Sequence, residues 1–552
     1  MSQYNRGRRD FLKKSLMTMG VMMMPFPRGL FSNVARATAL GVKGTRQHLI
    51  TIIDNGAWDQ SWFLNYLDPK LNSVMENTPA GWAALNKLRY GSASTAGVHA
   101  VTHPNGSSVF APGMKFWGTA DYNRFFFARG MNAVAGHNQH QFIYGGGTSP
   151  YMASASALIA AYQADARGAA PLHYVKLTTG TRDFINSGMM TGIAIPSLMP
   201  DHASWKTLTT PTSTTAPVSV SDGVAALGKI AQDKVKRDAS KGVVNGYMNG
   251  YSSSILLSSS QYATSDEFIT TWFQYFNAIY TEVKNHLTQS GGLGMIGDFR
   301  TGTSQATHPK ERPNNTFQAY YGGLNALTLP TTLATQSTFL NTNSGTADVQ
   351  MARTIAWKFA FAEFLVVKDL SAVVDLQPTG GDDHNLIIDD VGTRLMGMTC
   401  VRKLAERLSA VRPADCNGDS LLDRTLITYA SEFERGSKFS SDNVDFWGNS
   451  HSSSFSMIMA GHKSNMGKVL GELSRGDSAS VPVEYRNNDG DATETSDYGL
   501  ALAFDPVTGE RKTGADPLSP YSFLPTVLKM FSVPLPSQQI TEYQAIPFFM
   551  KS

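Results

Sequence analysis

The sequence predicts an α/β protein built as a three-layer α/β/α domain around a mostly parallel central sheet. Two patterns lead to this prediction. Short apolar runs alternate along the chain with longer segments of helical periodicity. Several of these runs are apolar almost throughout, as strands covered on both faces by helices are. With 42% apolar and 16% charged residues, the chain of 552 residues can bury a large core.

Twelve segments follow from this alternation of short and long patterns. The short runs predict strands at His48–Asp54, Asn123–Arg129, Leu172–Leu177, Ser371–Leu376, Thr425–Ala430 and Ser454–Ala460. The longer segments predict helices at Ala153–Ala166, Gly223–Ala239, Asp266–Leu287, Asp348–Lys368, Asp390–Val411 and Tyr521–Phe531. The third helix carries a stripe at helical spacing that predicts a core-facing side, made of Phe268, Trp272, Phe276, Ile279 and Val283.

Two polar stretches interrupt the pattern. Thr207–Ser221 is rich in Thr, Ser and Pro, and Gln289–Gln318 is rich in Gly, Asn and Thr. Because strand and helix signals resume beyond each, we interpret them as surface insertions near residues 200–222 and 288–318. The mature chain, residues 38–552, is then a single domain. A GxGxxG pattern at residues 292–297 follows a helix rather than a strand, so we interpret it as a loop.

The first 37 residues have the features of an export signal. Residues 7–13, GRRDFLK, resemble the twin-arginine motif, and the apolar stretch at 16–26 is too short to span a bilayer. Ala35-Arg36-Ala37 offers the small-x-small pattern of a signal-peptidase site. The sequence therefore predicts a partner in the twin-arginine export machinery. It also predicts a periplasmic or secreted mature protein without a transmembrane segment.

The net charge argues against a nucleic-acid-binding protein. The formal charge of +3 combines +6 from residues 1–37, which hold seven Lys or Arg and one acidic residue, with −3 from the rest of the chain. The rest of the chain carries 40 basic and 43 acidic side chains. Proteins that bind nucleic acid usually have a basic surplus, which the mature chain lacks.

Polar residues collect directly after the predicted strands, where open α/β sheets bind their ligands. Asp54 and Asp59 follow the first strand, and Asp382 and His384 follow the strand Ser371–Leu376. Carboxylates and imidazoles in such loops can bind a divalent metal such as zinc, calcium or manganese. The alternative is that they are turn residues that satisfy local backbone donors, since Asp-Asn-Gly and Gly-Asp-Asp are typical turn sequences.

Two further residues could complete such a coordination sphere. Glu432 follows the strand Thr425–Ala430, and His451 precedes the strand Ser454–Ala460. Each is a weak signal alone, because a single loop His is more often a hydrogen-bonded structural residue. The order of the four clusters along the chain is the informative feature.

That order resembles the alkaline phosphatase and sulfatase superfamily. The sequence is also similar to a family of exported, twin-arginine-bearing proteins of unknown function placed in that superfamily. The family's strand-end motifs GGxD, GxDxH and GEF would fall here at residues 56–59, 380–384 and 431–433. The resemblance implies an alkaline phosphatase-like fold and metal-dependent hydrolysis of phosphate or sulfate esters. The substrate would be an anionic small molecule or polymer.

The sequence departs from the superfamily at two positions. Glu432-Phe433 stands where the superfamily has a paired Asp-His, so one imidazole ligand is missing. The superfamily's nucleophile, a Ser, Thr or modified Cys after the second strand, has no clear counterpart. Between residues 130 and 147 the only hydroxyl is that of Tyr144.

Four residues near this position could replace the nucleophile or assist it. Thr148 and Ser149 precede Pro150 at a predicted helix N-terminus, where they could bind an oxyanion or attack a substrate, or simply cap the helix. His137 and His140 could bind metal or substrate, transfer protons, or be structural. Two functions therefore stay open: a hydrolase that uses a metal-bound hydroxide, and a non-catalytic binding or envelope-assembly protein on the same scaffold.

Overall fold

A computed structural model describes the parts of the chain from which the fold follows. These are residues 46–54, 56, 62–65, 101–106, 108–132, 143, 154–167, 174–177, 197–199, 265–290, 292–293, 317–342, 344–367, 369, 371–378, 388–413, 418–432, 434–439, 449–452, 454–475, 498–535 and 543–551. The predicted signal peptide, the predicted helix Gly223–Ala239 and the insertion Thr207–Ser221 lie outside these residues.

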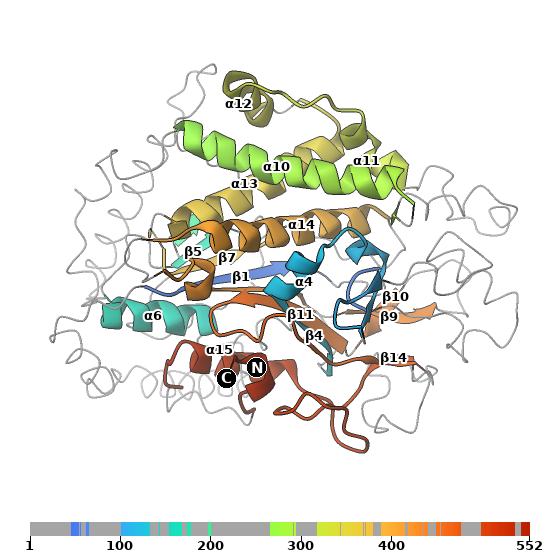
Figure 1. Cartoon of the computed structure of the whole chain (residues 1–552), viewed down its shortest axis with the longest axis vertical. Helices are drawn as coiled ribbons and strands as arrows, with labels where there is room; N and C mark the ends of the chain where they lie inside the picture. The colour runs from blue at the N-terminus through green and yellow to red at the C-terminus, as the bar shows by residue number, and fades with distance from the viewer. Residues whose placement is uncertain are drawn as a thin grey trace, which may run out of the picture.

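A mixed, mostly parallel sheet forms the centre of the described structure (Figure 1). Its strands lie in the order β12 (Val469–Leu470), β4 (Phe125–Asn132), β11 (Ser454–Gly461), β8 (Thr425–Ser431), β1 (His48–Asp54), β7 (Val373–Leu376), β5 (Tyr174–Leu177) and β6 (Ser197–Met199). Strand β11 is antiparallel to both of its neighbours, and the other adjacent pairs are parallel. The predicted α/β class with a mostly parallel sheet is confirmed.

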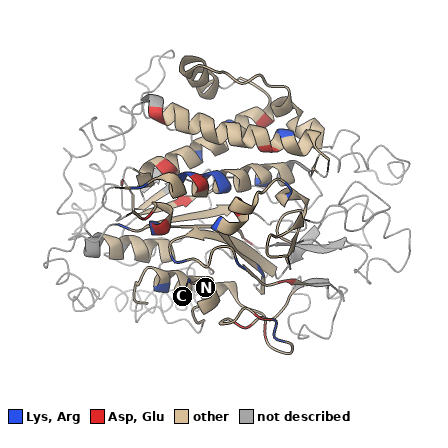
Figure 2. Ribbon diagram, viewed as in Figure 1, with Lys and Arg blue, Asp and Glu red and all other residues tan. Residues whose placement is uncertain are grey.

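Helices lie on both sides of this sheet (Figure 1). Helices α10 (Ser265–Thr288), α13 (Ala347–Val367) and α14 (Ile388–Ala410) lie on one side, and α6 (Ala155–Arg167) and α15 (Phe523–Met530) on the other. Because side chains alternate along a strand, Ile50 and Ile52 of β1 join the core under α10, α13 and α14, whereas Leu49 and Ile53 join the core under α6 and α15. The positions of Lys, Arg, Asp and Glu along the described ribbon fall mostly on helices and loops (Figure 2).

Smaller elements surround this centre. They include α4 (Thr119–Arg124), α11 (Phe317–Asn325) and α12 (Leu333–Asn341), and the strand pairs β2 (Val101–Thr102) with β3 (Val109–Phe110), β9 (Glu434–Phe439) with β10 (Asn449–Ser452), and β13 (Leu473–Arg475) with β14 (Tyr498–Ala501). Short 3₁₀ helices lie at Pro112–Met114, Leu422–Arg424, Pro520–Ser522 and Pro547–Phe549. None of the described helices is both long enough and apolar enough to cross a membrane.

The other predicted helices and strands are present in the described part of the chain, with small shifts at their ends. Strand β1 has the predicted bounds, and the stripe of α10 is buried as predicted. The largest shift is at β4, because Asn123 and Arg124 end α4 instead of beginning the strand. The Asp121 carboxylate accepts the Gly118 amide (2.9 Å) and caps this short helix, a local hydrogen bond that strand periodicity does not reveal. The insertion Gln289–Gln318 ends earlier than expected, since α11 begins at Phe317.

Candidate functional site

The sheet aligns the three strands that precede predicted site residues in the sequence. Strand β1 lies between β7 and β8 and is parallel to both, with Asp54 opposite Ser431. The carboxyl ends of the three strands therefore face the same way. Asp54 ends β1, Glu432 directly follows β8, and the segment after β7 leads to residues 382 and 384.

The described residues settle only part of the predicted set. The side chains of Asp54 and Glu432 are described, and His451 is described by its backbone in β10. Seven predicted residues lie outside the described parts of the chain: Asp59, His137, His140, Thr148, Ser149, Asp382 and His384. Within the described residues, no group of three or more His, Cys, Asp or Glu side chains is placed to hold a metal ion.

Asp54 lies in a buried polar cluster. Its exposed fraction is 0%, and its Oδ2 atom accepts a hydrogen bond from the hydroxyl of Tyr429. The same oxygen lies 3.4 Å from Nη1 of Arg394, whose side chain is 2% exposed. The phenol comes from the neighbouring strand β8, and the guanidinium comes from α14. Arg394 compensates the carboxylate charge, which would otherwise be costly to bury.

Tyr429 remains a hydrogen-bond donor in this cluster. Burial, and then the nearby Asp54 carboxylate, raise the pKa of Tyr429 well above its ordinary value. The phenol therefore keeps its proton at any physiological pH. Helix α14 approaches the phenol closely, since a Cβ built at Gly397 would lie 2.6 Å from the hydroxyl oxygen. A glycine at this position leaves room for the tyrosine to reach Asp54.

Glu432 is the second buried carboxylate at this edge. Its exposed fraction is 0%, and its backbone amide donates to the carbonyl of Gly56, two residues after Asp54 (3.2 Å). The segments that leave β1 and β8 therefore stay together beyond the ends of the strands. The backbone of His451 is also near this segment, because β10 pairs with β9 and Ser452 lies opposite Glu434.

A buried lysine lies at the end of β7. Lys358 of α13 is 2% exposed, and its ammonium donates to the carbonyls of Gln377 (2.7 Å) and Pro378 (3.3 Å). A Cβ at Gly397 would also lie 3.8 Å from Pro378, so α14 contacts both this turn and Tyr429. Lys358 thus holds the first residues after β7 against the helices, close to the Asp54 cluster.

Sequence reasoning did not identify Arg394, Tyr429 or Lys358. Two of them had a visible signal: Lys358 interrupts a largely apolar helical run, and Arg394 lies among apolar residues of the predicted helix Asp390–Val411. A charge within a core-facing helix is rarely buried without a partner. Tyr429 carried no such signal, since an aromatic residue is ordinary in a buried strand.

A third buried carboxylate, that of Asp375, lies on the face of the sheet opposite to Asp54. Asp375 of β7 accepts hydrogen bonds from the hydroxyls of Tyr174 and Ser156 (2.8 Å to Ser156). Thr51 of β1 extends the group, with its hydroxyl 3.3 Å from that of Ser156. Because Ser156 lies in the first turn of α6, the partial positive charge of the helix N-terminus also favours this carboxylate. We assign this group a structural role, fastening α6 to the sheet.

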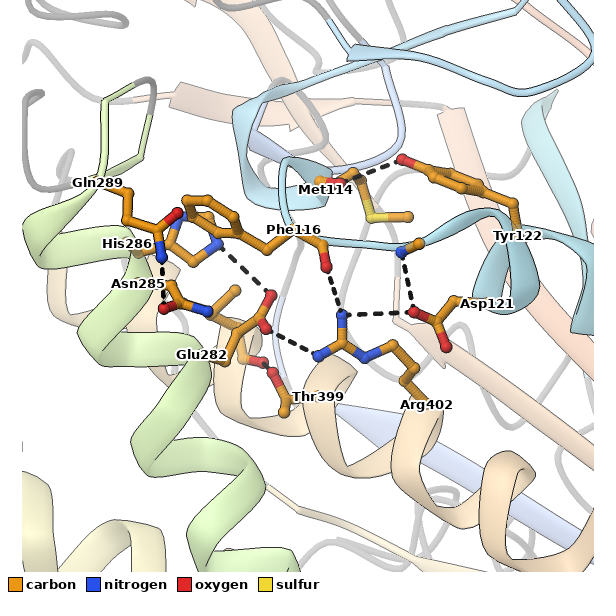
Figure 3. Close-up of polar contacts among 12 residues, drawn as sticks. Met114, Phe116, Asp121, Tyr122, Glu282, Asn285, His286, Gln289, Thr399 and Arg402 are labelled. Carbon is orange, nitrogen blue, oxygen red and sulfur yellow. Dashed lines mark hydrogen bonds and ion pairs between the residues drawn. The ribbon is translucent and has the colours of Figure 1, made fainter. Parts of the chain in front are cut away.

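A third polar cluster joins α4 to α10 and α14 (Figure 3). Arg402 of α14 donates to the Glu282 carboxylate (2.7 Å) and to the Phe116 carbonyl (3.2 Å), and it lies 3.8 Å from Asp121. His286 lies 3.7 Å from Glu282 and accepts the amide of Leu293 (3.2 Å). Burial opposes ionisation of Glu282, but His286 and Arg402 outweigh it, so the pKa of Glu282 is lowered. Because these residues pair with one another and join three helices, we assign the cluster a structural role.

The sequence was also compared with known proteins. It matches no protein-family model, and no curated protein is significantly similar to it.

Proposed function

We propose that the protein is an exported metal-dependent hydrolase that acts on phosphate or sulfate esters or on a related anionic substrate. In this proposal the fold is the three-layer, alkaline phosphatase-like arrangement, and export uses the twin-arginine pathway to the periplasm or beyond. The supporting observation is the shared carboxyl edge of β1, β7 and β8, with the buried Asp54 at the end of β1 and the buried Glu432 directly after the adjacent β8. Open α/β sheets bind ligands at such an edge.

The residue types that the proposal places at this edge are those that bind divalent metals. Asp54 and Glu432 are both buried, one at the end of β1 and one directly after β8, and Arg394 pairs with Asp54. Carboxylate oxygens suit calcium and manganese, and zinc accepts them together with imidazole nitrogens. In the proposal Asp54 or Asp59, Asp382, His384, Glu432 and His451 hold the metal. A bound divalent ion would polarise the ester and lower the pKa of a bound water.

The chain's own residues then have separate tasks. His137 and His140 would contact the anionic substrate, and one of them would transfer a proton to the leaving group. Thr148 or Ser149 is the candidate nucleophile if the reaction proceeds through a covalent intermediate. Lys358 would hold the segment after β7, from which Asp382 and His384 extend, through the carbonyls of Gln377 and Pro378.

A non-catalytic binding or envelope-assembly protein is the second candidate. The observation in its favour is that Asp54 already has two partners, Tyr429 and Arg394, within the core. A carboxylate with these contacts can serve the fold without any metal. The absence of a clear nucleophile in the sequence points the same way.

Metal content separates the two candidates. We expect the exported, chelator-free protein to bind about one or two equivalents of zinc, calcium or manganese. The variants Asp382→Ala and His451→Ala should lose this metal while remaining folded. Asp516→Ala is the matched control, because Asp516 is an exposed acidic residue in the C-terminal segment and should leave the metal content unchanged.

Hydrolysis assays complete the test. A metal-loaded wild type should cleave aryl phosphates or aryl sulfates, and the two metal-free variants should not. A folded wild type that takes up no metal, even from excess, would refute the hydrolase and favour the binding protein. If both variants still bind the metal, the metal-binding site lies elsewhere in the protein.

A further inference from the structure

We propose that His462 is a proton-dependent contact within the fold: its charged form holds the end of α15 against the start of β8, and loss of the proton weakens this attachment. His462 is a buried histidine that the proposed function does not use. The inference therefore stands whether or not the protein is a hydrolase.

Both ring nitrogens of His462 face backbone carbonyl oxygens. Nδ1 lies 3.1 Å from the carbonyl oxygen of Asp423, and Nε2 lies 3.1 Å from that of Met530. A carbonyl oxygen can only accept a hydrogen bond, and a neutral imidazole has one donor nitrogen and one acceptor nitrogen. Only the charged imidazolium can therefore donate to both carbonyls at once. In the neutral form, one nitrogen lone pair would face a carbonyl oxygen.

The burial of the ring makes this mismatch unfavourable. His462 is 5% exposed, and its ring lies against that of Phe531, with 5.0 Å between the ring centroids. Water therefore has little access to a nitrogen that faces a carbonyl without a proton between them. Burial by itself disfavours a charged ring. The two contacts oppose this effect, because hydrogen bonds from a charged donor are roughly twice as strong as neutral ones.

The carbonyl of Met530 needs a donor from outside its own helix. Met530 is the last residue of α15, and its carbonyl would accept the amide of residue 534 if the helix continued. Residue 534 is a proline, which has no N–H group, so His462 supplies the donor instead. The C-terminus of a helix also carries a partial negative charge, which favours a positive side chain there.

The turn that carries His462 is fixed against the sheet. Gly461 has a φ of +86°, and a Cβ at this position would collide with the carbonyl oxygen of Thr425. The amide of His462 donates to the same carbonyl (3.1 Å), and the amide of Asn465 donates to the carbonyl of Phe549 (3.0 Å). The turn thus joins the start of β8 to the segment around Phe549, and the His462 ring adds the end of α15.

Other charged or titratable residues lie on the elements around His462. They are Asp423, Arg424, Lys463, Lys529 and His48, the last of which lies opposite Thr425 in the β1–β8 ladder. The arginine and the two lysines oppose a positive charge on His462, whereas Asp423 favours it. Asp423 and both lysines are exposed, so water and salt screen their charges.

The sign of the pH dependence follows from the carbonyl contacts. In the unfolded chain a histidine loses its proton near pH 6.5, whereas the folded protein favours the charged ring. The contribution of His462 to stability is therefore complete below about pH 6.5 and is lost as the pH rises above it. His103 contributes with the opposite sign, because burial lowers its pKa. A local measurement at α15 separates the two residues.

Hydrogen exchange followed by mass spectrometry provides this local measurement. In the wild type, the amides of residues 523–533 should lose about tenfold in protection between about pH 6 and about pH 8.5, after correction for the intrinsic exchange rates. In His462→Gln the protection of these amides should already be lower at about pH 6. It should then stay constant over the same range, because glutamine does not titrate.

His48→Gln is the matched control. His48 is also buried at this edge of the sheet, but its Nδ1 contacts the carbonyl of Ser371 (2.8 Å) and its Nε2 lies 3.8 Å from Asp369. Both partners lie between α13 and β7 rather than on α15. The variant should therefore keep the pH-dependent protection of residues 523–533.

Each outcome supports or overturns the inference. A fall in protection that occurs in the wild type and in His48→Gln, but not in His462→Gln, would support it. Equal protection at about pH 6 and about pH 8.5 in the wild type would overturn it, and this result needs no variant. A fall that persists in His462→Gln, or that is lost equally in His48→Gln, would also overturn it, because another group would then be its source.

Discussion

Removing Arg407 should destabilise the helical layer by an amount that the structure allows us to work out. Arg407 of α14 makes two hydrogen bonds to the Glu363 carboxylate of α13, through Nε to Oε2 and Nη2 to Oε1, both 2.7 Å long. Tyr275 of α10 donates to Oε2 (2.6 Å). Three helices are therefore fastened at a carboxylate that is only 6% exposed.

The size of the effect follows from what remains after the substitution. In Arg407→Met the Glu363 carboxylate stays buried with the Tyr275 hydroxyl but without its counter-charge. Breaking a buried ion pair in this way costs about 3–5 kcal/mol. The Arg407 side chain is 23% exposed, so water can replace part of its interaction. We therefore expect a loss of about 2–3 kcal/mol in the free energy of unfolding.

Urea unfolding followed by tryptophan fluorescence measures this loss. The double variant Glu363→Met/Arg407→Met removes both charges and should lose less than the single variant, because no uncompensated carboxylate is left in the core. Arg412→Met is the control, since Arg412 is exposed and donates to the backbone carbonyls of Ser409 and Val411 near the end of α14. The reasoning is refuted if Arg407→Met lies within about 0.5 kcal/mol of wild type, the range of ordinary surface changes. It is equally refuted if the double variant is less stable than the single one.

Two further predictions concern the core and the pH dependence. Phe276→Ala should lower the free energy of unfolding in urea by about 3–5 kcal/mol, because the ring is fully buried and packs edge-on against Phe339, with 4.9 Å between the ring centroids. A loss below about 1 kcal/mol would contradict this packing. Burial lowers the pKa of His103 from 6.5, so the unfolded chain takes up a proton more readily than the folded one. Stability should therefore fall as the pH drops below 6.5 towards the folded-state pKa. His103→Gln should show a smaller drop between about pH 7.5 and about pH 5.5, and an unchanged drop would exclude His103 as its source.

The regular elements could be predicted because their signals are local. The stripe of α10 repeats every three or four residues, and β1 is largely apolar from Leu49 to Ile53, so each pattern is readable within one segment. The order in which the strands pair could not be predicted, because local signals do not reveal which strands become neighbours. Strand β11 lies between β4 and β8 and is antiparallel to both, although its own sequence resembles that of a parallel strand.

The candidate site also has features that local sequence predicts and features that it does not. The position of Asp54 and Glu432 at one edge of the sheet could be predicted, because parallel strands share one carboxyl edge whatever their order. The residues that contact Asp54 could not be predicted from the sequence. Tyr429 is 375 residues away along the chain, and Arg394 comes from a helix on one face of the sheet.

The sequence alone determined the α/β class, the positions of most helices and strands, and the placing of Asp54 and Glu432 at strand ends. These features depend on the periodicity of short segments and on turn-forming residues beside them. Only the tertiary structure decided that Arg394, Tyr429 and Gly397 surround Asp54 and that Lys358 holds the turn after β7. Burying a charge is favourable only when a partner lies within a few ångströms, and which residues meet at that distance depends on how α13 and α14 pack against the sheet.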